Sequence, residues 1–197
     1  MCKCVLLWHT APVLNKPPRN KAPGDPAWRD VDTFPSGRLP PNSRDWLLDE
    51  GSLTERLITA SGGEFRVERL SQCWQQPLLS ERRLLGLPGR QRALIREVVL
   101  RCHEEPWVYA RSVIPASTLT GSLRHLRHLQ NQSLGAMIFQ QPTLQRSEFQ
   151  LALLPGQSDY IHPLVRQDEP AWARRSRFLV EGKPLSVSEV FLRHFRT

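Results

Sequence analysis

Residues 93–114 read ALIREVVLRCHEEPWVYARSVI and contain two apolar, β-branched runs around a short polar turn. Ala93–Cys102 and Trp107–Ile114 are both rich in Val, Ile and Leu, and His103-Glu104-Glu105-Pro106 separates them. Residues of this kind favour strands, and a few polar residues are enough to reverse the chain. The segment therefore predicts an antiparallel hairpin, because a parallel pair would need a crossover of about a dozen residues or more.

Four further runs of alternating or β-rich residues extend this hairpin into a sheet. They are Phe65–Cys73, Thr143–Ala152, Trp172–Val180 and Leu185–Arg193. Glu181-Gly182-Lys183-Pro184 joins the last two runs and has the length and chemistry of a hairpin connection. Because short links join successive strands, we expect antiparallel pairing of about six strands.

Helix start and stop signals lie between these runs. They indicate a helix capped by Asn42 or Ser43 and ended by Gly51, one capped by Ser52 and ended by Gly62-Gly63, a short one capped by Ser80 and ended near Gly86, and helical pieces over 122–130 and 133–140, the latter capped by Ser133. Ser52 and Glu55 have the spacing of a capping box. The predicted fold class is α+β: a single six-stranded antiparallel sheet with a few helices packed on it.

The composition supports one folded domain preceded by a tail. Hydrophobic residues make up 40% of the 197, which is enough for a core in a chain of this length. Eight of the 17 prolines lie in residues 1–41, where they oppose both helices and sheet ladders. We therefore expect an irregular tail over residues 1–27 and a domain over 28–197. No apolar run reaches the roughly 18–20 residues that a membrane span needs, which excludes an integral membrane protein.

A formal net charge of +8 raises the question of nucleic-acid binding. Residues 42–197 hold 21 basic and 16 acidic residues, so most of the expected domain carries only about +5. Its densest basic stretch, residues 82–101, lacks the Gly-rich or aromatic interleaving of RNA-binding sheets. We therefore favour a solvated arginine-rich surface, which would attract a small polyanionic substrate, over a nucleic-acid partner. Four scattered cysteines do not make a disulfide scaffold, so we expect a cytoplasmic protein.

Two charged residues interrupt apolar strand faces, since residues two apart in a strand share a face. Arg96 is the single charge on the face of alternate residues from Leu94 to Cys102. Glu189 is the single charge in the middle of the face of alternate residues that starts at Leu185. An isolated charge is costly to bury. The pattern predicts either a closed pocket with polar anchors or a structural Arg–Glu pair in a core, and it leaves both open.

The remaining charged and metal-binding residue types give weaker signals. Glu97, Arg111 and the cluster Arg174-Arg175-Arg177 are further candidates for the site, although we favour a surface or structural role for each of them. His125 and His128 share a helix face, but no acidic or cysteine ligand lies near them in the sequence. The chain has no P-loop, no nucleophile elbow and no dinucleotide-binding fingerprint. We therefore expect no metal site and no cofactor.

Several ordered motifs of the chain resemble those of bacterial chorismate pyruvate-lyase. They are Asp45-Trp46-Leu47-Leu48 with Gly51–Leu57, Arg96–Leu100, Glu105-Pro106-Trp107, Ala110–Leu119, Ser133-Leu134-Gly135, Trp172–Phe178, Gly182–Leu185 and Ser188–Leu192. Each motif is weak by itself, but the ordered set is specific and covers roughly residues 28–197. Residues 1–27 and a long 153–171 segment depart from the pattern, and the second could alter a lid.

The resemblance implies an activity and a set of site residues. The family converts chorismate to 4-hydroxybenzoate and pyruvate, the first committed step toward ubiquinone, without a metal or organic cofactor. Its fold is a six-stranded antiparallel sheet with helices and a closed internal ligand pocket. The resemblance places the family's ligand-binding arginine on Arg96, its ligand-binding glutamate on Glu189, and two main-chain contacts on Leu53 and Leu134. Arg96 and Glu189 are thus the expected catalytic pair, and we also expect product inhibition and a monomer.

A non-catalytic sensor is the alternative, because the effector-binding domains of some GntR-type regulators resemble the same fold. Such regulators carry an N-terminal winged helix. The Pro-rich residues 1–41 show no helix–turn–helix pattern, so we expect the lyase.

Overall fold

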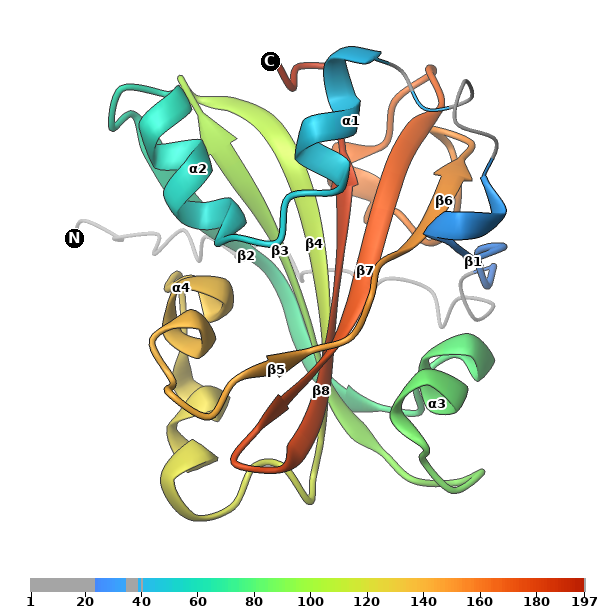
Figure 1. Cartoon of the computed structure of the whole chain (residues 1–197), viewed down its shortest axis with the longest axis vertical. Coiled ribbons are helices and arrows are strands. Elements are labelled where there is room, and N and C mark those ends of the chain that lie inside the picture. Colours follow the sequence, from blue (N-terminus) through green and yellow to red (C-terminus); the bar gives the residue numbers. More distant parts are fainter. Residues whose placement is uncertain (1–23, 35–38, 40, 197) are drawn as a thin grey trace, which may run out of the picture.

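One antiparallel sheet forms the centre of the protein (Figure 1). The computed structural model describes residues 24–34, 39 and 41–196. In that part of the chain the sheet has eight strands, ordered β1-β6-β7-β8-β4-β3-β2, with β5 also paired to β7. The strands are β1 Arg29–Asp30, β2 Phe65–Gln75, β3 Ala93–Cys102, β4 Glu105–Pro115, β5 Gln145–Arg146, β6 Gln150–Leu154, β7 Ala171–Val180 and β8 Lys183–Phe191.

The two hairpins expected from the sequence form the middle of this sheet. β3 pairs with β4 through a turn in which His103 and Glu104 adopt positive φ angles of 49° and 64°. β7 pairs with β8 through Glu181 and Gly182, whose φ angles are also positive. β4 and β8 then pair with each other, so four long strands of two hairpins lie side by side.

The expected count of six strands is wrong, because the described sheet has eight. β1 is an added two-residue strand that pairs with β6. The single strand expected over 143–152 is instead two short strands, β5 and β6, which both pair with β7. Between them Ser147 breaks the regular ladder, since its Oγ accepts a hydrogen bond from the Arg177 amide.

Four α-helices and three 3-10 helices complete the described structure. They are α1 Pro41–Leu47, α2 Leu53–Ala60, α3 Leu79–Leu85, α4 Leu134–Phe139, η1 Val31–Thr33, η2 Gly121–His128 and η3 Pro163–Val165. Ser52 and Ser133 cap α2 and α4 as expected, by accepting from the amides of Glu55 and Ala136. No helix of the described residues is long and apolar enough to cross a membrane.

Three of the helix predictions need correction. Asn42 and Ser43 lie inside α1 rather than at its cap, because the helix already begins at Pro41, a residue suited to the first turn. Ser80 lies inside α3, which begins at Leu79. The piece expected over 122–130 is the 3-10 helix η2.

The sheet separates two differently covered faces. The cavity face, named for the site described below, carries Arg96, Val98 and Leu100 of β3 and is covered by α1, α2, η2 and α4. Two apolar clusters lie on it, one under α1 and α2 and the other under η2 and α4. Figure 1 shows α2 and α4 on one side of the sheet and α3 on the other.

The opposite face is covered by α3 and by the segment between β6 and β7. Tyr160, Ile161 and Val165 of that segment pack into an apolar cluster with Tyr109 and Val190. The long 153–171 insertion therefore lies mainly behind the sheet, away from the cavity face.

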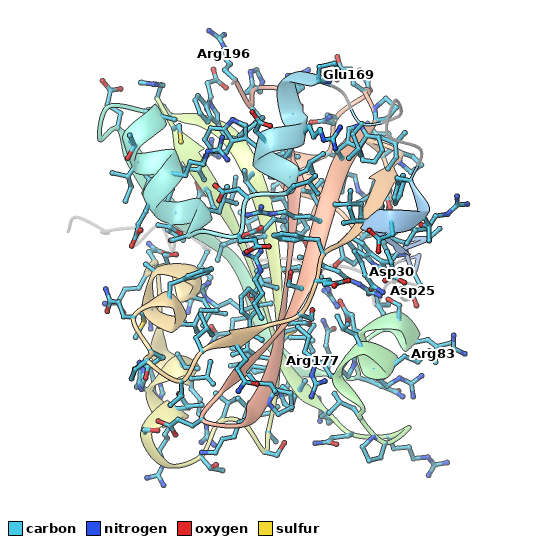
Figure 2. The ribbon with its side chains drawn as sticks, in the orientation of Figure 1. Asp25, Asp30, Arg83, Glu169, Arg177 and Arg196 are labelled. Carbon is cyan, nitrogen blue, oxygen red and sulfur yellow. The ribbon has the colours of Figure 1, made fainter. Side chains whose placement is uncertain are left out.

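The start of the described chain also contacts the opposite face. The Asp25 carboxylate accepts hydrogen bonds from the Ser80 amide at 2.8 Å and from the Ser80 hydroxyl at 2.5 Å. Figure 2 shows Asp25 beside α3, the helix that carries Arg83. Most of the expected tail, residues 1–23, lies outside the described residues.

Candidate active site

Arg96 is a buried cation that has no carboxylate partner among the described residues. Its side chain is 1% exposed, and its Nη2 donates to the carbonyl oxygens of Gln130 at 3.0 Å and Gln132 at 2.7 Å. Its Nε is buried without a hydrogen-bond partner. Burial, with a smaller effect from Arg69, lowers the pKa of Arg96 to about 10. The guanidinium thus keeps an unused donor and an unbalanced charge.

Glu189 is held by a different arginine. Arg174 Nε donates to Glu189 Oε2 at 2.6 Å, and the Glu189 side chain is 15% exposed. Arg96 and Glu189 do not form an ion pair with each other, so the alternative of a structural Arg–Glu pair between these two residues is wrong.

Strand register puts Arg96 and Glu189 on the same face of the sheet. Arg96 lies opposite Ser112 of β4, and Glu189 of β8 lies opposite Ala110, which is two residues away on β4. Both side chains line a small cavity with a volume of about 30 Å³. Its lining consists of Thr54, Arg96, Val98, Leu100, Ala110, Ser112, Ser133, Leu134, Gly135, Val187 and Glu189.

The first turns of α2 and α4 form the roof of the cavity. Leu53 and Leu134 are the first residues of these helices, and the hydroxyls of Thr54 and Ser133 lie 2.7 Å apart. Leu134 lines the cavity, whereas Thr54 rather than Leu53 represents α2 there. The first amides of a helix have no intrahelical acceptor, so the backbone at Leu134 can bind an acceptor atom in the cavity, whereas Leu53 is not part of the cavity lining.

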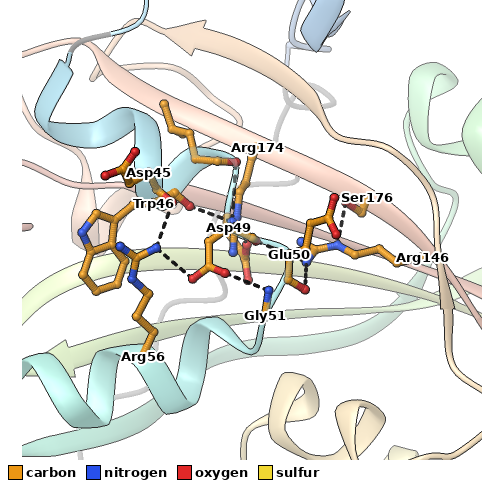
Figure 3. Close-up of polar contacts among 11 residues, drawn as sticks. Asp45, Trp46, Asp49, Glu50, Gly51, Arg56, Arg146, Arg174 and Ser176 are labelled. Atoms are coloured by element: carbon orange, nitrogen blue, oxygen red, sulfur yellow. Dashed lines mark hydrogen bonds and ion pairs between the residues drawn. The ribbon is translucent and has the colours of Figure 1, made fainter.

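Arg174 also belongs to this site, although alternation along the strand does not single it out from its charged neighbours. Besides Glu189, it donates from Nη1 to the carbonyl oxygens of Trp46 at 2.7 Å and Asp49 at 2.8 Å (Figure 3). The sequence makes it a further candidate but favours a surface or structural role for it, as for its neighbours. The hairpin turn at residues 181–184 could have identified it, because the strand register that follows from this turn places Arg174 directly opposite Glu189.

Sequence comparison identifies the family of this chain. The family model described as chorismate lyase matches residues 23–196. A protein of Methylococcus capsulatus named probable chorismate pyruvate-lyase is 42% identical over 151 residues, which cover 75% of this chain and 92% of the relative. A protein of the same name from Nitrosomonas europaea is 38% identical over 195 residues, covering 95% and 93%.

The chain belongs to the chorismate lyase family. Nearly all residues that line the cavity come from the motifs that resemble chorismate lyases. Thr54 belongs to the Gly51–Leu57 motif, and Glu189 belongs to Ser188–Leu192. The lining residues on β3, β4 and α4 belong to the motifs Arg96–Leu100, Ala110–Leu119 and Ser133-Leu134-Gly135. Of the lining residues, only Val187 lies between two motifs. Motifs that are far apart in the chain therefore meet at one place.

Solved structures are similar to this lyase family member in fold. The effector domain of PhnF from Mycobacterium smegmatis superposes with a TM-score of 0.53 and 16% sequence identity, covering 73% of this chain and 89% of that domain. At that identity the similarity concerns the arrangement of sheet and helices.

A second buried ionic network lies on the opposite face of the lyase fold. Arg111 is 3% exposed and donates to Glu81 at 2.8 Å and to Glu97 at 2.9 Å. Glu97 also accepts from the hydroxyls of Ser71 at 2.5 Å and Tyr109 at 2.7 Å. Burial opposes the charge of Arg111, but Glu81 raises its pKa well above the ordinary value. These residues tie α3 to the sheet, in agreement with the structural role expected for Glu97 and Arg111.

Among the described residues, no group of three His, Cys, Asp or Glu side chains is arranged to hold a metal ion. The polar groups of the cavity are one guanidinium, one carboxylate, three hydroxyls and backbone amides. This set can bind and orient an anionic substrate and can accept or donate a proton.

Proposed function

We propose that this protein is a chorismate pyruvate-lyase, which converts chorismate to 4-hydroxybenzoate and pyruvate. Membership of the chorismate lyase family supports the activity, as do relatives of that name at 38–42% identity over most of the chain. The observation that carries the proposal is the cavity of Arg96 and Glu189, in which a cation without a counterion faces a held carboxylate.

Arg96 binds the ring carboxylate of chorismate in this proposal. Its Nη2 is occupied by two carbonyl oxygens, whereas its Nε is free. A carboxylate would supply both the missing acceptor and the missing negative charge, and a charge-assisted hydrogen bond of this kind is stronger than a neutral one. The apolar side chains of Val98, Leu100 and Leu134 would then pack against the ring.

Glu189 faces the hydroxyl and ether end of the substrate. One carboxylate oxygen, Oε2, is bound by Arg174, so Oε1 is the oxygen that can accept the 4-hydroxyl. In the reaction, C4 loses its proton, the bond between C3 and the ether oxygen breaks, and its electron pair leaves with the three-carbon unit as enolpyruvate. Uptake of one proton at the methylene carbon, which balances the proton lost from C4, converts enolpyruvate to pyruvate. Formation of the aromatic ring drives these steps. We assign to Glu189 the orientation of C4 and assistance to the proton transfer.

The cavity volume has a consequence for release of the product. About 30 Å³ holds only about two water molecules, so a benzoate ring requires the roof to move. The roof is held by the contact between Thr54 and Ser133 and by the arginines that bind residues 45–50. We therefore expect slow release of 4-hydroxybenzoate and product inhibition.

The proposal includes no metal or organic cofactor, a monomeric protein and a role in ubiquinone biosynthesis in the cytoplasm. The side chains of the cavity suffice for binding and proton transfer, which supports a reaction without a metal. Prolonged treatment with EDTA should leave the rate unchanged. Sedimentation of the protein in the absence and presence of 4-hydroxybenzoate tests whether the protein is monomeric.

Incubation of the purified protein with chorismate tests the activity. We expect the absorbance of 4-hydroxybenzoate to appear together with one equivalent of pyruvate, and Arg96→Ala to abolish most of the rate at low chorismate concentration. The fold similarity to an effector domain supports the alternative of a sensor. Tight binding of 4-hydroxybenzoate without any turnover of chorismate would favour that alternative.

A further inference from the structure

Arg174 connects the carboxylate of Glu189 to the segment that leads into the cavity roof. Its side chain is 1% exposed and extends from β7 on the cavity face. Nε donates to Glu189 Oε2 at 2.6 Å, and Nη1 donates to Trp46 O and Asp49 O at 2.7 and 2.8 Å. One planar group thus contacts β8 on one side and, on the other, the end of α1 and the chain that follows it.

These contacts fix the guanidinium in one position. The carbonyl oxygens at the end of α1 have no intrahelical donors, so they need a partner. Arg174 supplies it for Trp46, and Arg56 supplies it for Asp45 at 2.8 Å. Phe149 and Phe191 lie 5.0 and 5.8 Å from the guanidinium and limit its sideways movement. A shift of Arg174 would therefore break hydrogen bonds at both ends.

Arg146 provides a contrast within the same region. It also binds this part of the chain, donating to the Glu50 carbonyl oxygen at 3.0 Å (Figure 3). It lies over the ring of Phe149 at 4.1 Å. Its Nε donates to the Ser176 hydroxyl rather than to a carboxylate. Burial lowers the pKa of Arg146 to about 10. Arg146 thus holds the same part of the chain without a hydrogen bond to Glu189, although the Glu189 carboxylate is near enough to raise its pKa and partly offset burial.

We propose that Arg174 is a positioning residue, which holds Glu189 Oε2 so that Oε1 faces the substrate only while the segment Trp46–Asp49 is seated. The inference rests on the proposed lyase function and deepens it. Arg174 does not touch the substrate in this proposal. It acts through Glu189, because it binds Oε2 and leaves Oε1 free for the substrate. The guanidinium itself is held in place by the carbonyl oxygens of Trp46 and Asp49.

A role through Glu189 makes a distinctive prediction for combined substitutions. Arg174→Met removes the charge and the hydrogen bonds but keeps an unbranched side chain of similar length. If Arg174 works by aiming Glu189, its loss should matter only while residue 189 is a carboxylate. In the background of Glu189→Gln the further substitution of Arg174 should therefore change kcat little.

The test is a double-mutant cycle on the full-length protein, with kcat, KM and the dissociation constant of 4-hydroxybenzoate measured for each variant. We expect Arg174→Met to lower kcat about 100-fold, as a misplaced catalytic group does, and to change KM and product affinity far less. Arg174→Lys should recover part of the loss, because it keeps a cation beside Glu189. The double variant should have the kcat of Glu189→Gln alone, within about twofold.

Arg175→Met is the matched control for a purely structural effect. Arg175 is the next residue of β7, is 5% exposed and lies on the opposite face, where it donates to Gln150 Oε1 at 2.9 Å and to Ser80 Oγ at 2.7 Å. Its loss should lower the melting temperature, whereas kcat should stay within about twofold of the wild type at a temperature where both are folded. An equal loss of kcat in Arg175→Met would overturn the proposal, as would full additivity of Arg174→Met and Glu189→Gln.

The outcomes also separate this inference from the proposed function. If the wild type converts chorismate and Glu189→Gln is slow while Arg174→Met keeps the wild-type kcat, only the role of Arg174 is wrong. If the wild type does not convert chorismate, the proposed function fails and the role of Arg174 fails with it. Should Arg174→Met not fold, Arg174→Lys and Arg174→Gln take its place in the cycle, with the same expected dependence on Glu189.

Discussion

Arg96 and Arg174 are both buried on the cavity face, but their charges are balanced differently. Arg174 has Glu189 as its counterion, whereas the partners of Arg96 among the described residues are two carbonyl oxygens. A buried cation without a counterion costs free energy, and a ligand carboxylate would remove that cost. The difference explains why one arginine is suited to bind substrate and the other to hold a side chain.

The first prediction concerns the binding role of Arg96. Arg96→Ala should weaken the binding of 4-hydroxybenzoate by roughly 10- to 150-fold, because a charge-assisted hydrogen bond contributes about 1.5–3 kcal/mol. The free protein should keep its melting temperature or gain slightly, since an unbalanced charge is removed. Calorimetric titration with the product and thermal unfolding of the unliganded protein measure the two effects. A large loss of stability with unchanged affinity per folded molecule would assign Arg96 to the fold instead.

At this scale, alternation along a strand was enough to single out Arg96 and Glu189, because each is one charge on an apolar face. It could not single out Arg174, which lies in a run with Arg175 and Arg177, where several charges occur together. Only the register of the hairpin, which places Arg174 opposite Glu189, distinguishes it from the other two.

At the level of elements, the central hairpins and the caps of α2 and α4 follow from local sequence. Short turns set the pairing of β3 with β4 and of β7 with β8, and the hydroxyls of Ser52 and Ser133 start the two helices. The division of residues 143–152 into β5 and β6 was not predictable in the same way. It depends on the contact of Ser147 with Arg177 of another strand, which local propensity does not report.

The segment behind the sheet gives a prediction for a single glycine. A Cβ at Gly156 would lie 2.3 Å from the carbonyl oxygens of both Gln167 and Glu169, which are backbone atoms. Gly156→Ala should therefore force the segment apart and lower the free energy of unfolding by about 1–3 kcal/mol. Because the segment lies mainly on the opposite face, kcat and KM measured well below the melting temperature should be unchanged.

Gly24→Ala is the control for Gly156→Ala, since a Cβ at Gly24 meets no atom within 4 Å. It should leave the melting temperature unchanged. Equal melting temperatures for the two variants would contradict the close packing of the segment, and an altered KM in Gly156→Ala would connect it to the active site.

In the whole molecule, the two faces of the sheet carry different kinds of polar groups. The groups that we propose to bind the ligand lie between two apolar clusters on the cavity face, where the roof helices meet. The opposite face holds the paired network of Glu81, Arg111 and Glu97, whose charges are satisfied internally. The α+β class and the central antiparallel pairing were predictable from sequence, whereas this segregation emerges only when distant segments pack.

The network on the opposite face predicts how stability depends on pH. Burial raises the pKa of Glu97, but Arg111 and the hydrogen bonds of Ser71 and Tyr109 outweigh burial and lower it below the ordinary value of 4.5. A carboxyl whose folded-state pKa is depressed stabilises the fold above its unfolded pKa, and this stability is lost as the pH falls through the folded value. The free energy of unfolding should therefore decrease as the pH falls below about 4.5.

Glu97→Gln tests this dependence. The variant should be less stable at pH 7, because Arg111 loses one of its two carboxylates, and its stability should fall less steeply in acid, by up to about 1.4 kcal/mol per pH unit. Denaturant unfolding at several pH values measures the slope. Glu104→Gln, at a side chain that is 78% exposed, is the control and should keep the wild-type slope. An unchanged slope in Glu97→Gln would mean that other carboxylates dominate the acid response.

The last prediction concerns where the working domain begins. Sequence composition puts the boundary between residues 27 and 28, yet Asp25 binds the Ser80 amide and hydroxyl of α3, and the family match begins at residue 23. Deletion of residues 1–23 should leave the melting temperature and kcat unchanged. Deletion of residues 1–27 should also keep kcat, because α3 lies on the opposite face from the cavity. It should lower the melting temperature by about 2–4 °C, since exposed hydrogen bonds contribute about 1 kcal/mol in total and each kcal/mol shifts a domain of this size by about 2–4 °C. Asp25→Asn in the full-length chain should reproduce most of that shift. If removal of residues 1–23 alone reduced kcat, those residues would belong to the catalytic unit and the boundary would have to move toward the N-terminus.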